Sequence, residues 1–399
     1  MKTTISLSGT ILRLYVITFL FFSANPIINI IIPLYSKSLG SSNAQIGIMM
    51  GSYVMTSMIF RPWAGKVVNA YGPQAILRVL LISNVLVLSL YTVVDVDWYF
   101  ILRAAQGVAT AFFSLALQMG IVDAMPEKER AQGISLYLLA GMLPTAIGPL
   151  VAYSLWDYGG MHAFAWTIIG IGLVSCMIGY QAQLPSRLSA DLGNEKADSF
   201  RTQLSIMFTH RAFLVSCLVM LIASSVYGAM TTFVALFSEQ IVIGHPGVFF
   251  MIQAGTMVIL RFTFRKKLPS DGQWHAPLVV GLLLCMGIGS GLLSLASYGG
   301  AAVMYLASFL TGCGMALLYP ILVTYLTFVL PRSVRNVLIG LFIAVSDLGS
   351  VFGNLVMGVV ADRLSYSSMY FINALLTLIT VGIVCIASFG LRKSPGKIR

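Results

Sequence analysis

Long apolar runs separated by short polar breaks make up most of the chain. A helix needs about 20 apolar residues to cross a bilayer, and twelve runs bounded by charged residues, Gly or Pro approach that length. We predict membrane helices at 11–35, 45–67, 74–94, 98–122, 132–155, 162–182, 211–238, 246–264, 276–297, 300–329, 334–360 and 366–390. The first run is too long for a signal-peptide core and has no convincing cleavage site, so we interpret it as a retained helix.

The composition agrees with an all-α integral membrane protein. Charged residues make up 9% of the chain and apolar residues 58%, whereas soluble domains are roughly 25% charged. The chain has no G-x-x-x-x-G-K-[ST] nucleotide loop and no H-E-x-x-H motif, and its four histidines are isolated in the sequence. We therefore predict no cofactor and no metal, and neither an ATP-driven pump nor a metal-dependent membrane enzyme.

The distribution of basic residues predicts the topology, because short loops rich in Lys and Arg stay in the cytoplasm. With both termini inside, only Lys37, Arg103 and Arg363 of the 24 Lys and Arg residues lie away from the inner side. We predict a multi-pass protein of the inner (plasma) membrane with both termini cytoplasmic. The net charge of +11 then indicates affinity for anionic membrane lipids rather than nucleic acid.

Several short patterns recur after about 200 positions. Arg61 and Gly72 return as Arg261 and Gly272. Two further echoes share a shift of 205: Q-G at 106 with T-G at 311, and P-E-K-E-R at 126 with P-R-S-V-R at 331. Internal repeats are common in membrane carriers.

The repeats predict two pseudo-symmetric halves of six helices each. We place the first half at 1–182 and the second at 210–399. The polar stretch 183–209 then forms a cytoplasmic linker between them.

Three motifs combine glycine or proline with polar residues at fixed spacing. They are Gly65, Asn69 and Gly72 between the second and third predicted helices, Arg103, Gln106 and Gly107 in the fourth, and Gly141, Pro144, Gly148 and Pro149 in the fifth. Through them the chain resembles, over nearly its whole length, the major facilitator superfamily, and within it the drug:proton antiporter-like exporters. Its general look is also similar to exporters of opine-type metallophores such as staphylopine, although no short motif carries that likeness.

The resemblance implies a secondary active transporter in which two six-helix halves rock around a midplane site. Its function would be proton-coupled export of a small organic molecule, either a drug-like compound or an opine-type metallophore, by a monomer. Asn69 replaces an acid that in the family helps latch helix 2 to helix 11, which puts the strength of that latch in doubt. Asp123 and Arg130 resemble a cytoplasmic charge relay, with a solvated interface pair as the alternative.

Arg103 lies in an apolar helix and continues a polar stripe. At 100° per residue, one arc of about 120° collects Tyr99, Arg103, Gln106, Thr110, Ser114 and Gln118. Lipid cannot satisfy such groups, so the stripe favours a water-filled cavity or another helix. The alternative is that Arg103 snorkels to the outer interface. We predict that Arg103 and Gln118 contact the substrate.

Asp347 is the acid nearest the middle of the membrane. It lies about 18 Å along its helix from Arg335, and desolvation at such a depth favours a protonatable carboxyl. We predict that Asp347 carries the coupling proton. The alternative is a hydrogen-bonded acid that joins its helix to a neighbour.

Four further residues are predicted to bind the substrate. Asn25 and Asn29 lie one turn apart beside Pro26, as a cavity wall or as interhelical contacts. Tyr227 belongs to a polar stripe on helix 7, and Tyr319 precedes Pro320, where helix 10 is expected to break. These aromatic rings either bracket a ring or cation or simply pack.

Two other function classes stay open. An importer of a small solute has the same fold, and only the helix 5 motif favours export. A lipid flippase or receptor without active transport is the rival from another class.

Overall fold

The computed structural model describes residues 9–125, 130–182, 210–264, 268–269, 272–330 and 335–391, and the predicted linker 183–209 lies outside them. The described part is helical, without strands. Its elements are α1 (Gly9–Ser38), α2 (Asn43–Tyr71), α3 (Pro73–Leu90), η1 (Val96–Trp98), α4 (Tyr99–Ala124), α5 (Arg130–Tyr180), α7 (Arg211–Ile241), α8 (Pro246–Phe264), α9 (Ala276–Ser294), α10 (Ala296–Val329), α11 (Arg335–Arg363) and α12 (Tyr366–Leu391).

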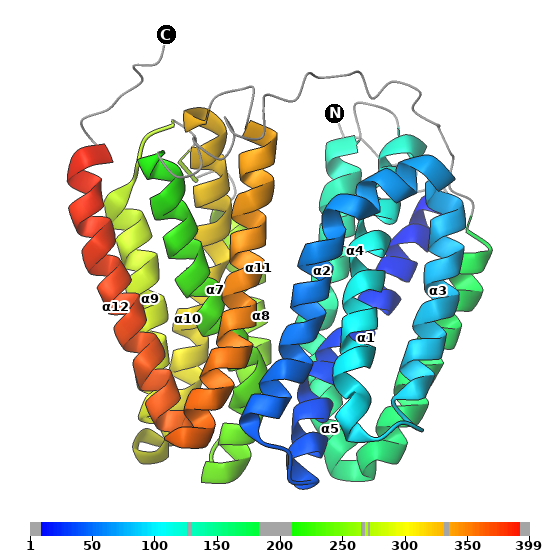
Figure 1. Ribbon diagram of the computed structural model, residues 1–399, viewed down its shortest axis with the longest axis horizontal. Helices are drawn as coiled ribbons and strands as arrows, with labels where there is room; N and C mark the ends of the chain where they lie inside the picture. The colour runs from blue at the N-terminus through cyan, green and yellow to red at the C-terminus, as the bar shows by residue number, and fades with distance from the viewer. Residues whose placement is uncertain are drawn as a thin grey trace. The chain divides into compact units, whose positions relative to one another are not determined.

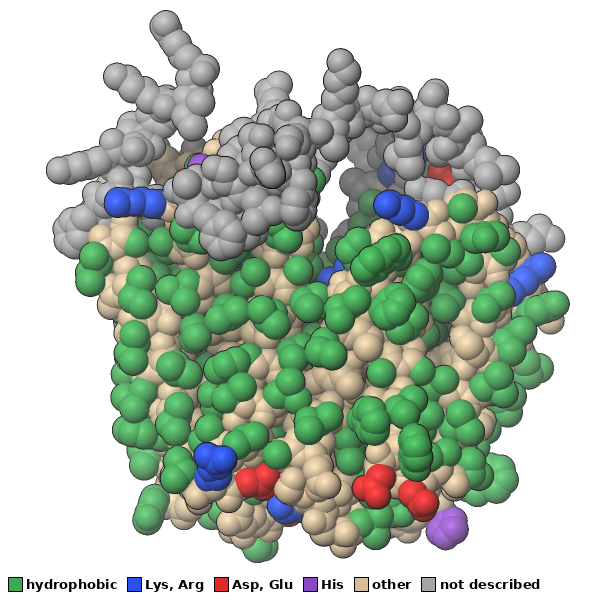
Figure 2. All heavy atoms as spheres, in the orientation of Figure 1, with side chains coloured by type: hydrophobic (Ala, Val, Ile, Leu, Met, Phe, Trp, Pro, Cys, Tyr) green, Lys and Arg blue, Asp and Glu red, His purple; other side chains and the backbone are tan. Residues whose placement is uncertain are grey.

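These helices supply twelve membrane crossings. Ten stretches of the described residues are long and apolar enough to span a membrane. One of them holds two crossings, because Gly160 (φ 52°, ψ −139°) divides α5 into helical legs at 130–159 and 161–180. The twelfth is α2, with 29 residues. The predicted twelve-helix membrane fold is therefore confirmed, and apolar side chains cover much of the visible surface between the charged ends (Figure 2).

The chain divides into two compact units. Unit 1 comprises residues 1–39 and 52–192, and unit 2 comprises 40–51 and 193–399. In unit 1, α1 packs along α5, and α3 packs against α4 and α5. In unit 2, α7 packs along α11, and α9 packs against α10 and α12 (Figure 1). The units differ from the predicted halves at 40–51, so α2 begins in unit 2 and continues in unit 1.

The first turn of α2 is capped by a side chain from the end of α11. Asp362 accepts two hydrogen bonds, Asn43 N to Oδ1 and Ala44 N to Oδ2, both 2.8 Å long. The Tyr366 hydroxyl donates to Asn43 Oδ1. A carboxylate at a helix N-terminus satisfies free N–H groups and complements the helix dipole. This cap, which we call the Asp362 cap, ties the start of α2 to unit 2.

The turn after α2 shows how the repeated glycines are used. Gly72 has φ 80° and Gly272 has φ 70°, a left-handed conformation that glycine adopts without steric cost. Both precede a helix, α3 and α9 respectively. Because no Gly or Pro lies between residue 67 and Gly72, α2 runs to Tyr71 rather than ending near 67 as predicted. Gly65 and Asn69 consequently lie inside α2, not in a loop.

Candidate functional site

Arg103 is enclosed by unit 1. It lies one turn into α4, about 6 Å along the axis from Tyr99, and only 1% of its surface is exposed. The snorkelling alternative is therefore wrong for this structure, because α1 and α2 cover the guanidinium before it reaches the helix end. A cation in such surroundings is costly unless hydrogen bonds or opposite charge offset its desolvation.

The partners of Arg103 are amide oxygens. Its Nη1 donates to Asn25 Oδ1 at 2.9 Å and to Gln106 Oε1 at 3.2 Å. Its Nη2 donates to Asn29 Oδ1. Its Nε is buried without a hydrogen-bond partner. Within the described part of the chain, the cation is thus held by neutral groups alone, while Asn25 and Asn29 are themselves half-buried.

Two tyrosines that the sequence analysis missed complete the surroundings of Arg103. The Tyr53 ring lies 4.5 Å from the Arg103 Cζ, a cation–π contact. The buried Tyr91 hydroxyl donates to Gln106 Oε1 at 2.9 Å. Tyr99 in turn donates to the Tyr91 carbonyl at 2.9 Å. These contacts fix Gln106 as an acceptor that faces Arg103.

Gly107 explains how α2 reaches Arg103. A Cβ at this position would overlap the backbone oxygen of Tyr53 and the hydroxyl of Thr56. Thr56 Oγ1 also donates to the Ala104 carbonyl at 2.8 Å. Only glycine lets α4 and α2 approach so closely, and the approach is what sets the Tyr53 ring against the guanidinium.

The helix 5 motif has a similar role toward α1. A Cβ at Gly148 would lie 2.6 Å from Pro26 Cβ, too short for real packing. Gly148 and Pro149 are buried, and α1 packs along α5. Since Pro26 directly follows Asn25, close packing at Gly148 sets the position of the amides that hold Arg103.

The other motif residues of unit 1 lie away from this cluster. Gln118 is 15 residues beyond Arg103, about 22 Å along α4, and its side chain hydrogen-bonds with Tyr137. The side chain of Asn69 is outside the described part of the structure. Asp123 is the penultimate residue of α4 and Arg130 the first of α5.

In unit 2, Asp347 lies half-buried on α11. Its neighbour Ser346 shares a 2.9 Å hydrogen bond with Ser224 of α7. Gly349 and Gly353 follow on α11, and a Cβ at either would overlap a backbone oxygen of α7. Asp347 therefore lies beside a seam of close α7–α11 packing.

The predicted break of α10 is wrong. Pro320 lies inside α10, which continues to Val329, and the non-helical residue of this helix is Gly300. A proline removes one backbone hydrogen bond, and membrane helices tolerate that loss where neighbouring groups compensate. The Tyr319 ring lies 6.0 Å from the Phe342 ring of α11. Tyr227, on α7, is also half-buried.

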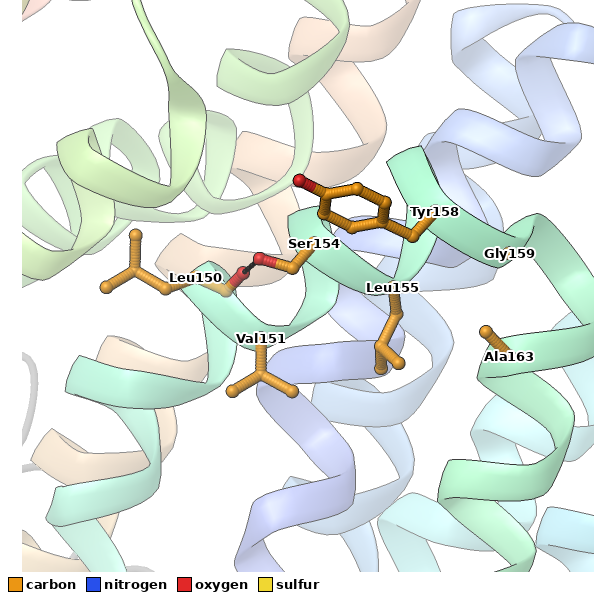
Figure 3. Close-up of a pocket in the computed structure, with 7 residues that line it drawn as sticks. All are labelled: Leu150, Val151, Ser154, Leu155, Tyr158, Gly159 and Ala163. Carbon is orange, nitrogen blue, oxygen red and sulfur yellow. Dashed lines mark hydrogen bonds between the residues drawn. The ribbon is translucent and has the colours of Figure 1, made fainter.

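A hollow of about 440 Å³ lies at the end of the first leg of α5 (Figure 3). Its lining is mostly apolar, and Ser154 Oγ donates to the Leu150 carbonyl at 3.0 Å. Tyr158, 94% exposed, stands at its rim. The hollow includes none of the predicted binding residues. Among the described residues, no group of three His, Cys, Asp or Glu side chains is placed to hold a metal ion.

Comparison with known proteins extends the picture. The family model described as Major Facilitator Superfamily matches residues 14–306 and 275–398. The chain is 40% identical over 386 residues to the staphylopine export protein of Staphylococcus aureus, covering 96% of each chain. It is 24% identical to the putative multidrug resistance protein MdtD of Salmonella typhi, over 41% of this chain and 36% of that protein.

Solved structures show the same fold. A mutant form of the nucleoside transporter NupG superposes with a TM-score of 0.80, covering 95% of this chain and 100% of that one at 13% identity. At that identity the likeness concerns the arrangement of helices only.

Proposed function

The chain belongs to the major facilitator superfamily, and from that premise we propose that this multi-pass transporter exports an opine-type metallophore of the staphylopine kind in exchange for protons. The named relative, 40% identical over nearly all of both chains, supports the cargo class. The distribution of basic residues supports a location in the inner membrane with both termini cytoplasmic, and the family resemblance supports action as a monomer. Drug efflux is the second candidate, favoured by the partial likeness to MdtD.

The single observation that carries the proposal is the arginine in unit 1 with neutral partners. Arg103 is 1% exposed, and Asn25, Asn29 and Gln106 offer it amide oxygens but no negative charge. An opine carries more than one carboxylate, and a guanidinium binds a carboxylate through two parallel hydrogen bonds. A carboxylate of the cargo would thus supply the missing charge.

The asparagines can take part in that exchange. Each side-chain amide has one acceptor oxygen and an NH₂ group with two donors. When the cargo carboxylate takes the Nη donors of Arg103, the amides of Asn25 and Asn29 can turn their donors to the same group. They are half-buried whereas Arg103 is buried, so the cargo reaches the cation along the asparagine side.

We assign proton coupling to Asp347. Its depth on α11, about 18 Å from Arg335, supports a carboxyl that changes protonation as its access to water changes between states. Asp347→Asn keeps the shape and removes the titration. The variant should exchange labelled for unlabelled staphylopine across proteoliposomes but fail to concentrate it under a proton gradient. Loss of exchange as well would favour a helix-joining role.

Transport itself is tested with everted membrane vesicles that contain the full chain. Uptake of staphylopine should require an acidic lumen and stop when a protonophore is added. If uptake continues unchanged in the presence of the protonophore, transport is not coupled to protons and that part of the proposal is wrong. Uptake of lipophilic cations such as ethidium, but not staphylopine, would favour drug efflux.

The proposed topology has its own test. Single cysteines at Ser42, Asp157 and Ser297 should react with an impermeant thiol reagent added outside cells, whereas one at Gly193 should not. Asp157 and Ser297 are exposed in the structure, so their labelling reports the side of the membrane. Labelling at Gly193 with protection of the other sites would invert the assignment.

A further inference from the structure

Unit 2 has an arginine of its own within a membrane-spanning helix. Arg261 lies near the end of α8, about 22 Å along the axis from Pro246. We propose that Arg261, together with the hydroxyls of Tyr227 and Tyr319, forms an anion subsite in unit 2 that binds a carboxylate of the cargo. The inference rests on the proposed export function and adds a specificity-determining subsite to it.

The hydrogen bond from Arg261 shows where the side chain lies. Nε donates to the Ala316 carbonyl of α10 at 3.1 Å. Ala316 is about 24 Å from the bend at Gly300 and about 20 Å from the end of α10 at Val329. Arg261 itself is three residues before the end of α8, so its guanidinium joins the last turn of α8 to the middle of α10.

The same bond orients the guanidinium. With Nε directed at a backbone carbonyl, the Nη1 and Nη2 amino groups form the edge of the fork that faces away from that bond. This edge has the spacing that matches the two oxygens of a carboxylate. Arg261 is also half-buried, unlike Arg103, so part of its surface is accessible.

Two tyrosines lie near Arg261. Tyr227 of α7 and Tyr319 of α10 are both within electrostatic range of the Arg261 guanidinium. Tyr227 lies about 21 Å along α7 from Ile241, and Tyr319 lies about 28 Å along α10 from Gly300. Each hydroxyl can donate a hydrogen bond, so the three residues form a set of donors suited to an anion.

The chemistry of the set indicates which part of the cargo it takes. A guanidinium with two phenol donors suits a carboxylate, because a half-buried cation is stabilised by a negatively charged partner. An opine carries more than one carboxylate and can present one of them to Arg261.

The test measures staphylopine binding to the purified full chain by titration calorimetry. Charge-assisted hydrogen bonds of this kind contribute enough that Arg261→Gln should raise Kd about 10- to 100-fold. Arg261→Lys should raise Kd less, because it keeps the charge without the planar fork. Tyr227→Phe and Tyr319→Phe should each raise Kd about 3- to 10-fold.

Methyl esters of staphylopine separate binding from a merely structural role. For the ester that blocks the carboxylate held by Arg261, wild type and Arg261→Gln should have equal Kd values. If Arg261→Gln weakens the binding of unmodified staphylopine and of every ester by the same factor, the residue acts through the fold and the subsite is overturned.

Arg335→Gln is the matched control. Arg335 also lies in unit 2 and donates from Nη2 to a backbone carbonyl, that of Leu330, at 3.3 Å, but it begins α11. Its loss should leave Kd unchanged. If wild type binds staphylopine and Arg261→Gln binds it with the same Kd, the subsite alone is overturned. If wild type does not bind staphylopine, the proposed cargo is overturned as well.

Discussion

α4 of unit 1 and α10 of unit 2 each meet a neighbouring helix through a glycine. Gly107 lets α4 lie against Tyr53 of α2, and Gly312 lets α10 lie against Gln253 of α8, where a Cβ would come within 2.9 Å of the Gln253 backbone oxygen. Tyr53 and Gln253 differ by 200 positions and the glycines by 205, the two shifts of the sequence repeat. The same close helix contact at a glycine therefore occurs in both units.

The two helices differ in the polar residue one turn before the glycine. In α4 it is Arg103, and in α10 it is the buried Ser308, which donates to the Phe249 carbonyl. The residue directly before the glycine is Gln106 in α4 and Thr311 in α10, and Thr311 receives a 3.0 Å bond from Gln253. In α10 neutral groups satisfy one another, whereas α4 retains a cation. The comparison teaches that the glycine contact is common to both helices, whereas the buried charge is present in α4 and absent from α10.

Removing the charge should have the largest effect. Arg103→Ala, which gives α4 the uncharged character of α10, should lower staphylopine transport about 100-fold at normal protein level, because the cargo carboxylate loses its charged partner. Arg103→Lys should recover part of the rate. Transport by Arg103→Ala at the wild-type rate would show that the charge has no part in binding. Vesicle uptake normalised to protein level provides the measurement.

Replacing each of the two glycines with alanine should lower the stability of the protein by different amounts. Gly107→Ala overlaps Tyr53 more severely than Gly312→Ala overlaps Gln253, and overpacking costs typically about 1–3 kcal/mol. Gly107→Ala should therefore lower the melting temperature of the purified protein more than Gly312→Ala does. It should also slow transport, since the Tyr53 ring moves from Arg103. The reverse order of melting temperatures would contradict the shared packing role.

Disturbing α1 should give a smaller change in transport. Gly148→Ala pushes against Pro26 and shifts the adjacent amide of Asn25, so we expect about a tenfold loss of transport. Gly170→Ala, in the second leg of α5 where a Cβ meets nothing within 4 Å, is the matched control and should transport normally. Equal transport rates for the two variants would show that Gly148 does not position Asn25.

We expect the smallest effect from removing the Gln253–Thr311 hydrogen bond in unit 2. Thr311→Val removes the hydroxyl that Gln253 contacts, and a buried hydrogen bond between neutral groups contributes about 1 kcal/mol. The melting temperature should fall by a few degrees, with transport within about twofold of wild type. A large loss of transport would mean that α10 has a polar role comparable to that of α4.

The twelve helices could be predicted because membrane crossings are local properties of the sequence. Run length and the spacing of charges identify them without any knowledge of neighbours. The polar stripe on α4 was found in the same way, from helical periodicity. The end of α2 is predicted too early because its last turns contain polar residues, although the helix continues to Tyr71, directly before Gly72.

Contacts between helices could not be predicted from the pattern of apolar and polar residues. Nothing local to Tyr53 or Tyr91 indicates that they meet Arg103 or Gln106. Tyr319–Pro320 misled because proline ends soluble helices, whereas α10 continues through it. The pairing of Asp362 with Asn43 joins residues far apart in the chain, so no window of sequence contains it.

The Asp362 cap also affects the order in which the chain is completed. Asn43 and Asp362 are 319 positions apart, and ribosomes synthesise the N-terminal residues first. The start of α2 is thus made long before its capping carboxylate, and its first N–H groups must be satisfied by other means until α11 is inserted. A nascent chain that stops before residue 362 cannot form this contact, so the capping of residues 43 and 44 by α11 is one of the last steps of biogenesis.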